Sequence, residues 1–354
     1  MRAPGTAPNA LAIITVRNEG AFLLEWLAHH RAVGFSNFLV FSNNCQDGTD
    51  TMLDRLQDMG WVTHVRNDGP YDKGGIQFTA LKSTTDTQAY QDADWLLPLD
   101  IDEFVNIHTG DGTLTALLDA LPVATAITLT WRLFGNAGEV RHKNAPITDT
   151  FTKAAPEVIY WPWRAAMFKT LYKNDGTYGK LGVHRPRNPN LDQIQDAQWF
   201  DGHGRAMDGQ YKTRRIFSPY GRSNFGLVQL NHYPLGSMES FILKADRGRA
   251  VHATDTLGLD YWIERNFNTD TDTSIARYAT DRDAHLAELM ADDILHNLHG
   301  WAVKWRHKRF DELMKLEPYR ALFGRLLMAP PSRPITQKAA QFLIQHATIS
   351  SAGD

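Results

Sequence analysis

The chain has few of the features that mark secreted, membrane-spanning or nucleic-acid-binding proteins. A single cysteine, Cys45, in 354 residues excludes an internal disulfide framework and fits a reducing compartment. Apolar runs such as Ala10–Val16 fall far below the roughly 18 residues that span a bilayer. The N-terminal MRAPGTAPNA lacks the apolar core of a secretion signal. A formal net charge of -3 gives no basic field for nucleic acid. We therefore expect a cytoplasmic protein with no transmembrane segment and no nucleic-acid partner.

Short apolar segments alternate with amphipathic ones through the first 130 residues. Strands are expected at 10–16, 37–42, 61–65 and 95–99, and helices at 19–33, 51–59 and 75–89. This alternation predicts an α/β fold with a parallel sheet. Residues 131–235 are rich in Trp, Tyr, Pro, Gly and His, which indicates irregular loops around a site. Helical periodicity resumes at Gly236, so we predict a catalytic domain at 9–235 and a helical region at 236–354.

The segment LLPLDIDEF carries two acidic residues directly after an apolar strand. In an extended chain, Asp100 and Asp102 point to one side while Ile101 faces the core. Two neighbouring carboxylates attract a divalent cation, and their hard oxygens suit Mn²⁺ or Mg²⁺ with a diphosphate completing the shell. Open α/β sheets bind ligands at this edge. A short acidic loop that caps a helix is the alternative, since the bare D-x-D pattern is common.

Polar residues also follow the first two predicted strands. Thr15, Arg17 and Glu19 come after the first strand, and SNNCQDGTD follows the second. Two such strand ends make a nucleotide site at one sheet edge, where Arg17 approaches phosphates and Asp47 accepts from a base or ribose. For Asp47, capping of the next helix is the alternative.

These motifs together resemble a known family. TVRNEGAFLLEWLAHHRAVGFSNFLVFSNNCQDGTDTML, followed by LPLDIDEF, is similar to family 2-type glycosyltransferases and related to the family 92 galactosyltransferases. The resemblance covers residues 10–135, with a weaker block at 165–250 that includes GVHRPR and LNHYPLGSMESFILKADRGR. It implies a GT-A fold with a mixed sheet flanked by helices, a nucleotide-diphosphate sugar donor and a divalent metal on the D-x-D pair. It also implies that Thr15, Arg17, Glu19 and Asp47 line the nucleotide pocket.

Two departures narrow this expectation. The second turn reads SNNCQDGTD rather than carrying a doubled acidic D-D-x-S, so contacts to the base are less defined. A Q-x-x-R-W element of processive synthases is not found in the sequence. The resemblance therefore implies a non-processive enzyme, and inversion at the anomeric carbon is expected from the family 2 likeness alone.

The second half supplies candidate metal ligands and cations. A metal on two carboxylates commonly recruits a neutral imidazole from a distant segment, and either His184 or His232 fits. Lys244 and Arg247, three apart on a predicted helix, share one face and stabilise the departing diphosphate. Each of these residues could instead be an ordinary core or surface residue.

The remaining site predictions concern the donor pocket and the base. We assign donor binding to Thr15, Arg17, Glu19, Asp47, Lys73, Gln77, Asp100, Ile101, Lys244 and Arg247. An inverting enzyme needs a carboxylate to deprotonate the acceptor hydroxyl. Asp201, in the turn WFDGHG, is the first choice among the acids of the middle segment.

Three other protein classes remain as alternatives to a glycosyltransferase, and the acceptor is not defined by the sequence. A nucleotidyltransferase usually opens with a glycine-rich basic loop, which TVRNEG does not provide. A non-catalytic nucleotide-sugar-binding module would not need the acidic pair, and a phosphohydrolase would need a second metal set. The expected donor is a UDP-sugar, and the acceptor a glycan, a lipid-linked molecule or a protein. A homodimer and association with the inner membrane face are both compatible with the helical C-terminal region.

Overall fold

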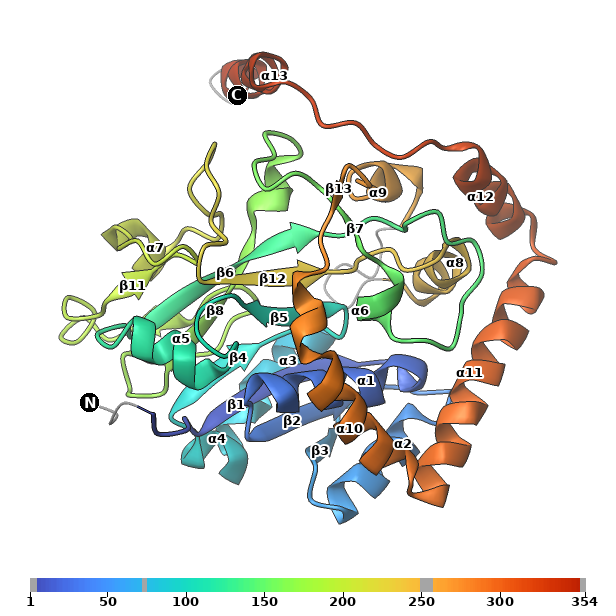
Figure 1. Cartoon of the computed structure of the whole chain (residues 1–354), viewed down its shortest axis with the longest axis horizontal. Coiled ribbons are helices and arrows are strands. Elements are labelled where there is room, and N and C mark those ends of the chain that lie inside the picture. Colours follow the sequence, from blue (N-terminus) through green and yellow to red (C-terminus); the bar gives the residue numbers. More distant parts are fainter. Residues whose placement is uncertain (1–4, 72–74, 249–256, 351–354) are drawn as a thin grey trace.

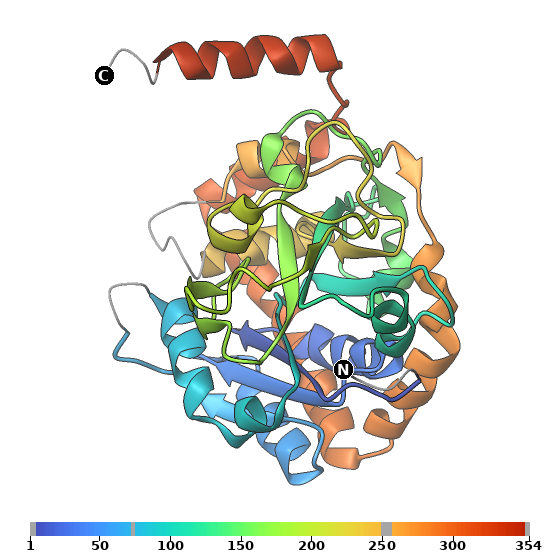
Figure 2. The same cartoon turned by 90° about the vertical axis from the view of Figure 1, so that its left-hand side faces the viewer.

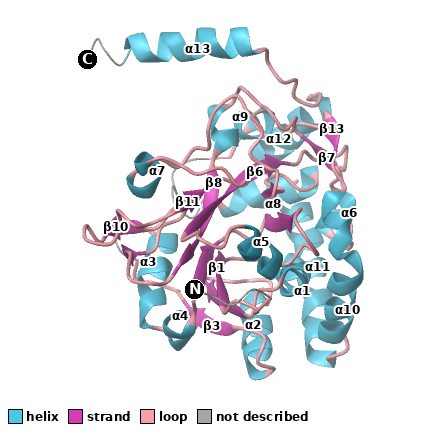
Figure 3. Cartoon of the chain, turned by 60° about the vertical axis from the view of Figure 1, so that its left-hand side comes forward, coloured by secondary structure: helices cyan, strands magenta, loops and turns pink. Residues whose placement is uncertain are grey.

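The molecule is built on a mixed sheet covered by helices on both faces (Figures 1 and 3). The computed structural model describes residues 5–71, 75–248 and 257–350. Nine strands form the main sheet, in the order β3-β2-β1-β4-β8-β6-β12-β5 with β11 beside β6. The expected mixed sheet flanked by helices, with a helical C-terminal region, is confirmed.

The strands of the main sheet are β1 (Ala10–Val16), β2 (Asn37–Ser42), β3 (Thr63–Arg66), β4 (Trp95–Pro98), β5 (Glu103–Ile107), β6 (Ala126–Leu133), β8 (Phe168–Lys173), β11 (Trp199–Phe200) and β12 (Val228–His232). Two small sheets pair β9 (Tyr178–Lys180) with β10 (Arg187–Pro189) and β7 (Lys153–Ala154) with β13 (Asp270–Thr271). The helices are α1 (Gly20–Val33), α2 (Thr49–Asp58), α3 (Ile76–Ser83), α4 (Gln88–Asp92), α5 (Leu114–Ala120), α6 (Ile147–Thr150), α7 (Gly209–Thr213), α8 (Met238–Arg247), α9 (Leu259–Ile263), α10 (Ala279–Met290), α11 (Asp293–Leu313), α12 (Glu317–Met328) and α13 (Gln337–Ser350).

The N-terminal half of the sheet follows the sequence pattern closely. β3, β2, β1 and β4 are parallel neighbours, and β1 and β2 have the predicted bounds. Alternate side chains of β1 enter different cores. Ala10, Ala12 and Ile14 pack with α1 and α2, whereas Leu11 and Ile13 pack with α3 on the other face. Burial on both faces explains why this strand reads as a continuous apolar run.

The middle region contributes more regular structure than its composition predicts. β8 lies antiparallel between β4 and β6, and β12 lies between β6 and β5. The expectation of irregular loops for residues 131–235 therefore understates the strands that this region adds to the main sheet. Both strands are short and are flanked by Pro, Gly and Trp, and pairing with distant strands outweighs this weak local signal.

The acidic motif does not continue the strand as an extended segment. β4 ends at Pro98, and the amide of Glu103 donates to the carbonyl oxygen of Asp100 (3.0 Å). Residues 100–103 thus form a turn, stabilised by the Asp100 amide donating to the Glu103 carboxylate (2.9 Å). The expectation that Asp100 and Asp102 lie on an extended segment, with alternating side chains, is therefore wrong. The turn nevertheless places both carboxylates at the same edge of the sheet.

Helix α1 holds this turn in place through β5. The Trp26 indole donates to the carbonyl oxygen of Glu103 (2.9 Å), and the His29 ring bonds the carbonyl oxygen of Val105 (2.8 Å). Both side chains are fully buried. Hydrogen bonds from a buried helix to strand carbonyls fix the position of β5 and of the turn that precedes it.

The C-terminal region is largely helical and packs on both halves of the molecule. α10 contacts α1, and α11 contacts α2, α1 and α8. α13 extends away from the body in both views (Figures 1 and 2). Among the described helices, none combines the length and the apolar character required to cross a membrane. A domain boundary at residue 235 stays a prediction.

The burial of His29 predicts a pH-dependent stability. Burial lowers the pKa of His29 from 6.5 to about 4. A lowered folded-state pKa contributes stability above pH 6.5, which is lost as the pH falls toward 4, up to about 3 kcal/mol. We expect urea unfolding of the wild type, compared with His29→Gln, to show this acid-dependent loss. The exposed control His296→Gln should keep the full wild-type pH dependence, and an unchanged dependence in His29→Gln would contradict the assignment.

Candidate functional site

A cavity of about 610 Å³ opens at the carboxyl ends of β1 and β4. It collects most of the residues that the sequence predicts for donor and metal binding. These are Thr15, Arg17, Glu19, Gln77, Asp100, Ile101, Asp102, His184, His232, Lys244 and Arg247. They come from β1, α3, the acidic turn, the segment after β9, β12 and α8. The sheet therefore brings together segments that are far apart in the sequence, at the edge where α/β sheets bind ligands.

Asp100 is held by a fully buried lysine. The ammonium group of Lys169, on β8, lies 2.9 Å from one carboxylate oxygen of Asp100, and the Gln77 amide donates to the other (3.1 Å). Burial alone would lower the pKa of Lys169, but the charges of Asp100 and then Glu103 outweigh it and raise that pKa. Lys169 is thus a buried cation in contact with Asp100, which itself lines the cavity.

Asp102 has a second lysine and a histidine beside it. The Lys244 ammonium lies 2.7 Å from one oxygen of Asp102, and Nε2 of His232 lies 3.7 Å from the other. Burial raises the pKa of Asp102, but Lys244 and then His232 outweigh it and the net shift is downward. Asp102 is therefore ionised at neutral pH, with one carboxylate oxygen turned to His232.

Glu103 is a third acid at the turn that sequence reasoning passed over. Its side chain is fully buried, and its two oxygens accept from the Trp131 indole (2.5 Å) and from the Asp100 amide (2.9 Å). Burial raises the pKa of Glu103 to about 8. Its position after D-x-D was visible in the sequence, but its complete burial depends on β6 and β8. Lys169 could also have been noticed in the sequence, because it lies in the strand FKTLYK next to Phe168 and close to Leu171.

The two candidate histidines are in different hydrogen-bonding states. Nδ1 of His184 lies 3.1 Å from the carbonyl oxygen of Phe168, so Nδ1 carries the proton and Nε2 keeps a lone pair. His232 lies beside Asp102, and its Nδ1 is buried without a partner among the described residues. Burial lowers the pKa of His184 to about 4 and that of His232 to about 3. Both rings are neutral at pH 7, which metal ligation requires.

The far wall of the cavity is formed by an ion pair between α1 and α8. Arg247 pairs with the Glu19 carboxylate and also donates to the carbonyl oxygen of Arg17 (2.9 Å). Lys244 and Arg247 share one helix face, as their spacing predicts. Ile101 is 9% exposed and lines the cavity while packing in the core. These contacts place a cationic helix face against the acidic turn.

Asp47 and Lys73 are not part of this cavity as described. Asp47 is fully buried, and its oxygens accept from the amides of Gly20 (3.0 Å) and Thr49 (3.0 Å) and from the Thr49 hydroxyl (2.5 Å). These contacts join the starts of α1 and α2. Asp47 therefore has the helix-capping role that was the alternative to ligand binding. Lys73 lies outside the described residues.

Asp201 is also separate from the cavity, which corrects its assignment as base. Its carboxylate is fully buried, 2.9 Å from the Arg205 guanidinium, and it accepts from the amides of His203 (3.0 Å) and Arg205 (2.9 Å). The glycines of WFDGHG do mark a tight turn, with Gly204 at φ +90°. The turn is built around the aspartate itself rather than around a ligand.

The metal-binding potential of the site rests on few protein ligands. Within the described residues, no group of three or more His, Cys, Asp or Glu side chains is arranged to hold an ion. The Asp102 oxygen and His232 Nε2 that are 3.7 Å apart are one carboxylate and one imidazole facing each other. This pair suits Mn²⁺ in ligand type, provided that further ligands come from substrate or water.

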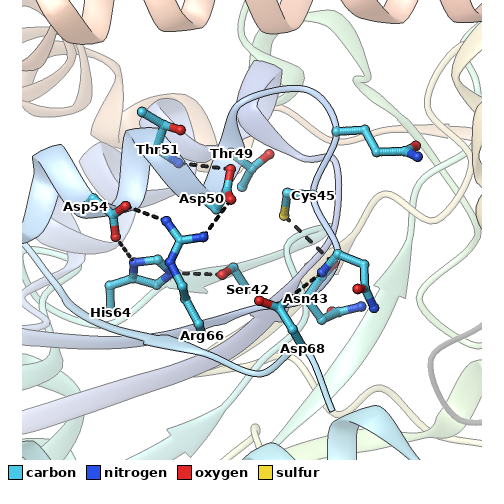
Figure 4. A network of polar contacts seen from close by, with 12 residues as sticks. Ser42, Asn43, Cys45, Thr49, Asp50, Thr51, Asp54, His64, Arg66 and Asp68 are labelled. Atoms are coloured by element: carbon cyan, nitrogen blue, oxygen red, sulfur yellow. Dashed lines mark hydrogen bonds and ion pairs between the residues drawn. The ribbon is translucent and has the colours of Figure 1, made fainter. Parts of the chain in front are cut away.

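A serine, a histidine and an aspartate are joined by hydrogen bonds at the ends of β2 and β3 (Figure 4). The Ser42 hydroxyl is 2.8 Å from Nε2 of His64, whose Nδ1 is 2.7 Å from Asp54, and Arg66 bonds the same aspartate (2.5 Å). Ser42 is only 1% exposed and is not among the residues that line any described cavity. The network ties α2 to the ends of β2 and β3, and it does not present a nucleophile.

Similarity to solved structures is broad but weak. A mannosyltransferase from Pyrobaculum calidifontis, solved with GDP-Man and Mn²⁺, is 13% identical over 91% of this chain and 84% of that one, with a TM-score of 0.35. The S. aureus protein TarS is 13% identical over 86% of this chain and 55% of that one, with a TM-score of 0.33. Similarities this low support no statement about the site.

Similarity to curated sequences is more specific. A glycosyltransferase family 92 protein of Ricinus communis is 29% identical over 109 residues, which are 30% of this chain and 19% of that protein. A family 92 protein of Oryza sativa subsp. japonica is 27% identical over 150 residues, 40% of this chain and 24% of that protein. The chain thus matches about a fifth to a quarter of the length of these relatives.

The family model gives the decisive match. It is the model of glycosyltransferase family 92, and it covers residues 14–197, which are 184 of the 354 residues. The matched segment includes the end of β1, the acidic turn, Lys169 and His184. The resemblance to family 92 inferred from the motifs is confirmed, and the wider likeness to family 2 stays a prediction. The chain belongs to glycosyltransferase family 92.

Proposed function

We propose that this protein transfers a glycosyl group from a nucleotide-diphosphate sugar, with UDP as the expected nucleotide, to a hydroxyl of a glycan, lipid-linked or protein acceptor. The observation that carries the proposal is the 610 Å³ cavity in which Asp100 and Asp102 face lysines and neutral histidines at the sheet edge. Its volume suits a nucleotide-sugar-sized ligand. Family membership supports the reaction class.

The donor's diphosphate would be bound by cations already present in the cavity. Lys244 and Arg247 line one side, and Arg187 lines the other. Negative charge grows on the leaving diphosphate, and fixed cations in a partly buried site stabilise that charge. These cations come from two separate elements that line the cavity, α8 and β10.

A divalent cation, Mn²⁺ or Mg²⁺, would be held by Asp102 and His232. Asp102 has one oxygen bound to Lys244 and the other turned to His232, whereas both oxygens of Asp100 already accept hydrogen bonds. When bound, the cation supplies Lewis-acid stabilisation of the leaving group. The chain's own contribution is to keep Asp102 ionised and His232 neutral.

His184 is our candidate for the group that accepts the proton of the acceptor hydroxyl. The carboxylates that line the cavity, Glu19, Asp100 and Asp102, are each paired with a cation. His184 instead has a lone pair on Nε2 and a fixed ring orientation. A positioned imidazole is a common general base.

Donor binding tests the central claim. Calorimetric titration of the wild type with a panel of nucleotide sugars and Mn²⁺ should show one preferred donor, and EDTA should abolish its binding. Asp102→Ala should weaken that binding on the order of 100-fold or more, since it removes a direct metal ligand. The exposed Asp94→Ala is the matched control and should bind like the wild type. Absence of binding of every nucleotide sugar to folded protein would refute the proposal.

The two histidines are distinguished by separate readouts. His232→Ala should weaken Mn²⁺-dependent donor binding by at least about 10-fold. His184→Ala should leave donor binding intact and lower kcat by about 100-fold or more, because it removes the general base. Without a known acceptor, hydrolysis of the preferred donor, in which water takes the glycosyl group and UDP is released, measures kcat. If His184→Ala weakened donor binding and His232→Ala lowered only kcat, His184 would be the metal ligand and His232 the base.

Asp201 provides a test of the corrected assignment. Asp201→Asn should lower the free energy of unfolding by about 2 kcal/mol, because the buried carboxylate loses its charged hydrogen bond with the partly exposed Arg205. Donor affinity and kcat of the folded variant should match those of the wild type. A loss of kcat with unchanged stability would restore Asp201 as the base.

A further inference from the structure

A second cavity, of about 260 Å³, lies behind the donor cavity. It is enclosed by the start of α1, residues 141–151, α8 and α11. Arg17, Glu19, Ile101, Asp102, Lys244 and Arg247 line both cavities. The ion pairs Glu19–Arg247 and Asp102–Lys244 therefore form the partition between them.

The wall of the second cavity carries an excess of positive charge. Seven Lys or Arg residues line it, against three Asp or Glu residues. Most of the cations have a carboxylate partner: Lys244 has Asp102, Arg247 has Glu19, and Arg309 has Asp246. Two arginines, Arg17 and Arg306, have no ion pair among the described residues, and the ε nitrogen of each is buried without a hydrogen bond.

Arg306 is the most unusual of these groups. It is 5% exposed, and its guanidinium carbon lies 4.4 Å from the ring centroid of Phe22. Within the described part of the chain, no oxygen accepts a hydrogen bond from its guanidinium group. Burial lowers the pKa of Arg306 to about 10, so the group is still charged at neutral pH. The charges of Asp47 and Glu239 act against this lowering of the pKa, but neither carboxylate forms an ion pair with Arg306. A buried guanidinium without a direct ion pair is costly unless a ligand supplies one.

The neighbouring His142 adds a second buried polar group without a partner. It lines the cavity, and burial followed by the charge of Arg306 lowers its pKa to about 3. Its Nε2 is buried and has no partner within the described residues. Arg17, at the end of β1, lines the same cavity. The guanidinium of Arg306 lies over the Phe22 ring, and its planar fork suits bidentate contact with an oxyanion.

We infer that this second cavity is a binding site for a small oxyanion, a phosphate or carboxylate group, held by Arg306 and Arg17. The volume is well above that of a single water site and suits a group of a few heavy atoms. The inference rests on the charge and burial of the cavity and does not depend on the proposed donor or reaction. Because the partition is shared, the bound group lies next to the acidic turn.

The test measures the midpoint of thermal unfolding of the full chain with inorganic phosphate and, separately, with malonate, at constant ionic strength. We expect one or both anions to raise the Tm of the wild type, because a ligand that binds only the folded state stabilises it. Arg306→Met should abolish that rise. It should not lower the Tm without anion, since it removes a buried unpaired charge. Arg306→Lys, which keeps the charge, should retain part of the rise.

The control separates the two cavities. Arg164 lines the donor cavity and not the smaller one, so Arg164→Gln should respond to the anion like the wild type. A rise that survives Arg306→Met, or that is lost in Arg164→Gln, would overturn the inference by placing the anion elsewhere. Absence of any rise in the wild type with both anions would overturn it as well. The relative effects of phosphate and malonate identify which oxyanion the site prefers.

Discussion

The buried ion pair between Lys169 and Asp100 is the interaction on which the site depends. Lys169 is fully buried on a central strand, and a charge removed from water in this way costs several kcal/mol unless it is paired. The pairing therefore favours only arrangements in which β8 lies beside β4 with the acidic turn above it. The Asp100 side chain is 38% exposed and that of Asp102, paired with Lys244, is 20% exposed, so each carboxylate is held by a lysine while both line the cavity.

Glu103 completes the charge balance of the turn. Burial raises its pKa to about 8, and the charge of Lys169, whose ammonium lies 3.5 Å from one oxygen of Glu103, opposes that rise. The two aspartates are matched by the two lysines, Lys169 and Lys244. If a divalent cation entered with a diphosphate, the negative charge of the diphosphate would offset that of the cation, and the balance of the buried groups would change little. This arrangement explains how a site so rich in charge is stable before it binds anything.

The sequence was most informative where structure is determined locally. β1, β2 and α1 follow from apolar periodicity, and the bounds of the two strands match those predicted. The Lys244–Arg247 face follows from helical spacing alone. Clustering at the cavity was inferred for most site residues because strand ends of a parallel sheet meet at one edge.

The parts that could not be predicted depend on long-range pairing. β8 and β12 are short strands whose partners lie far away in the sequence, so their place in the main sheet could not be read from local composition. Asp47 looked like a ligand-binding acid because it follows the second strand and matches the family motif, and Asp201 because glycines lie beside it. In the structure the backbone amides of those turns, and for Asp201 an arginine, satisfy both carboxylates. An acid that caps a turn and an acid that binds substrate have the same local sequence, and only the surrounding fold distinguishes them.

The shared partition between the two cavities has a consequence for how their contents interact. Lys244 is drawn to Asp102, and Arg247 to Glu19. A cation bound by Asp102 would weaken the attraction between Asp102 and Lys244. The ammonium group of Lys244 would then be freer to pair with an anion in either cavity. An anion beside Arg306 and Arg17 would, in turn, relieve the repulsion that these arginines exert on Arg247. Since coupling between two binding equilibria is reciprocal, any effect that a ligand in one cavity has on binding in the other is matched by an equal effect in the reverse direction.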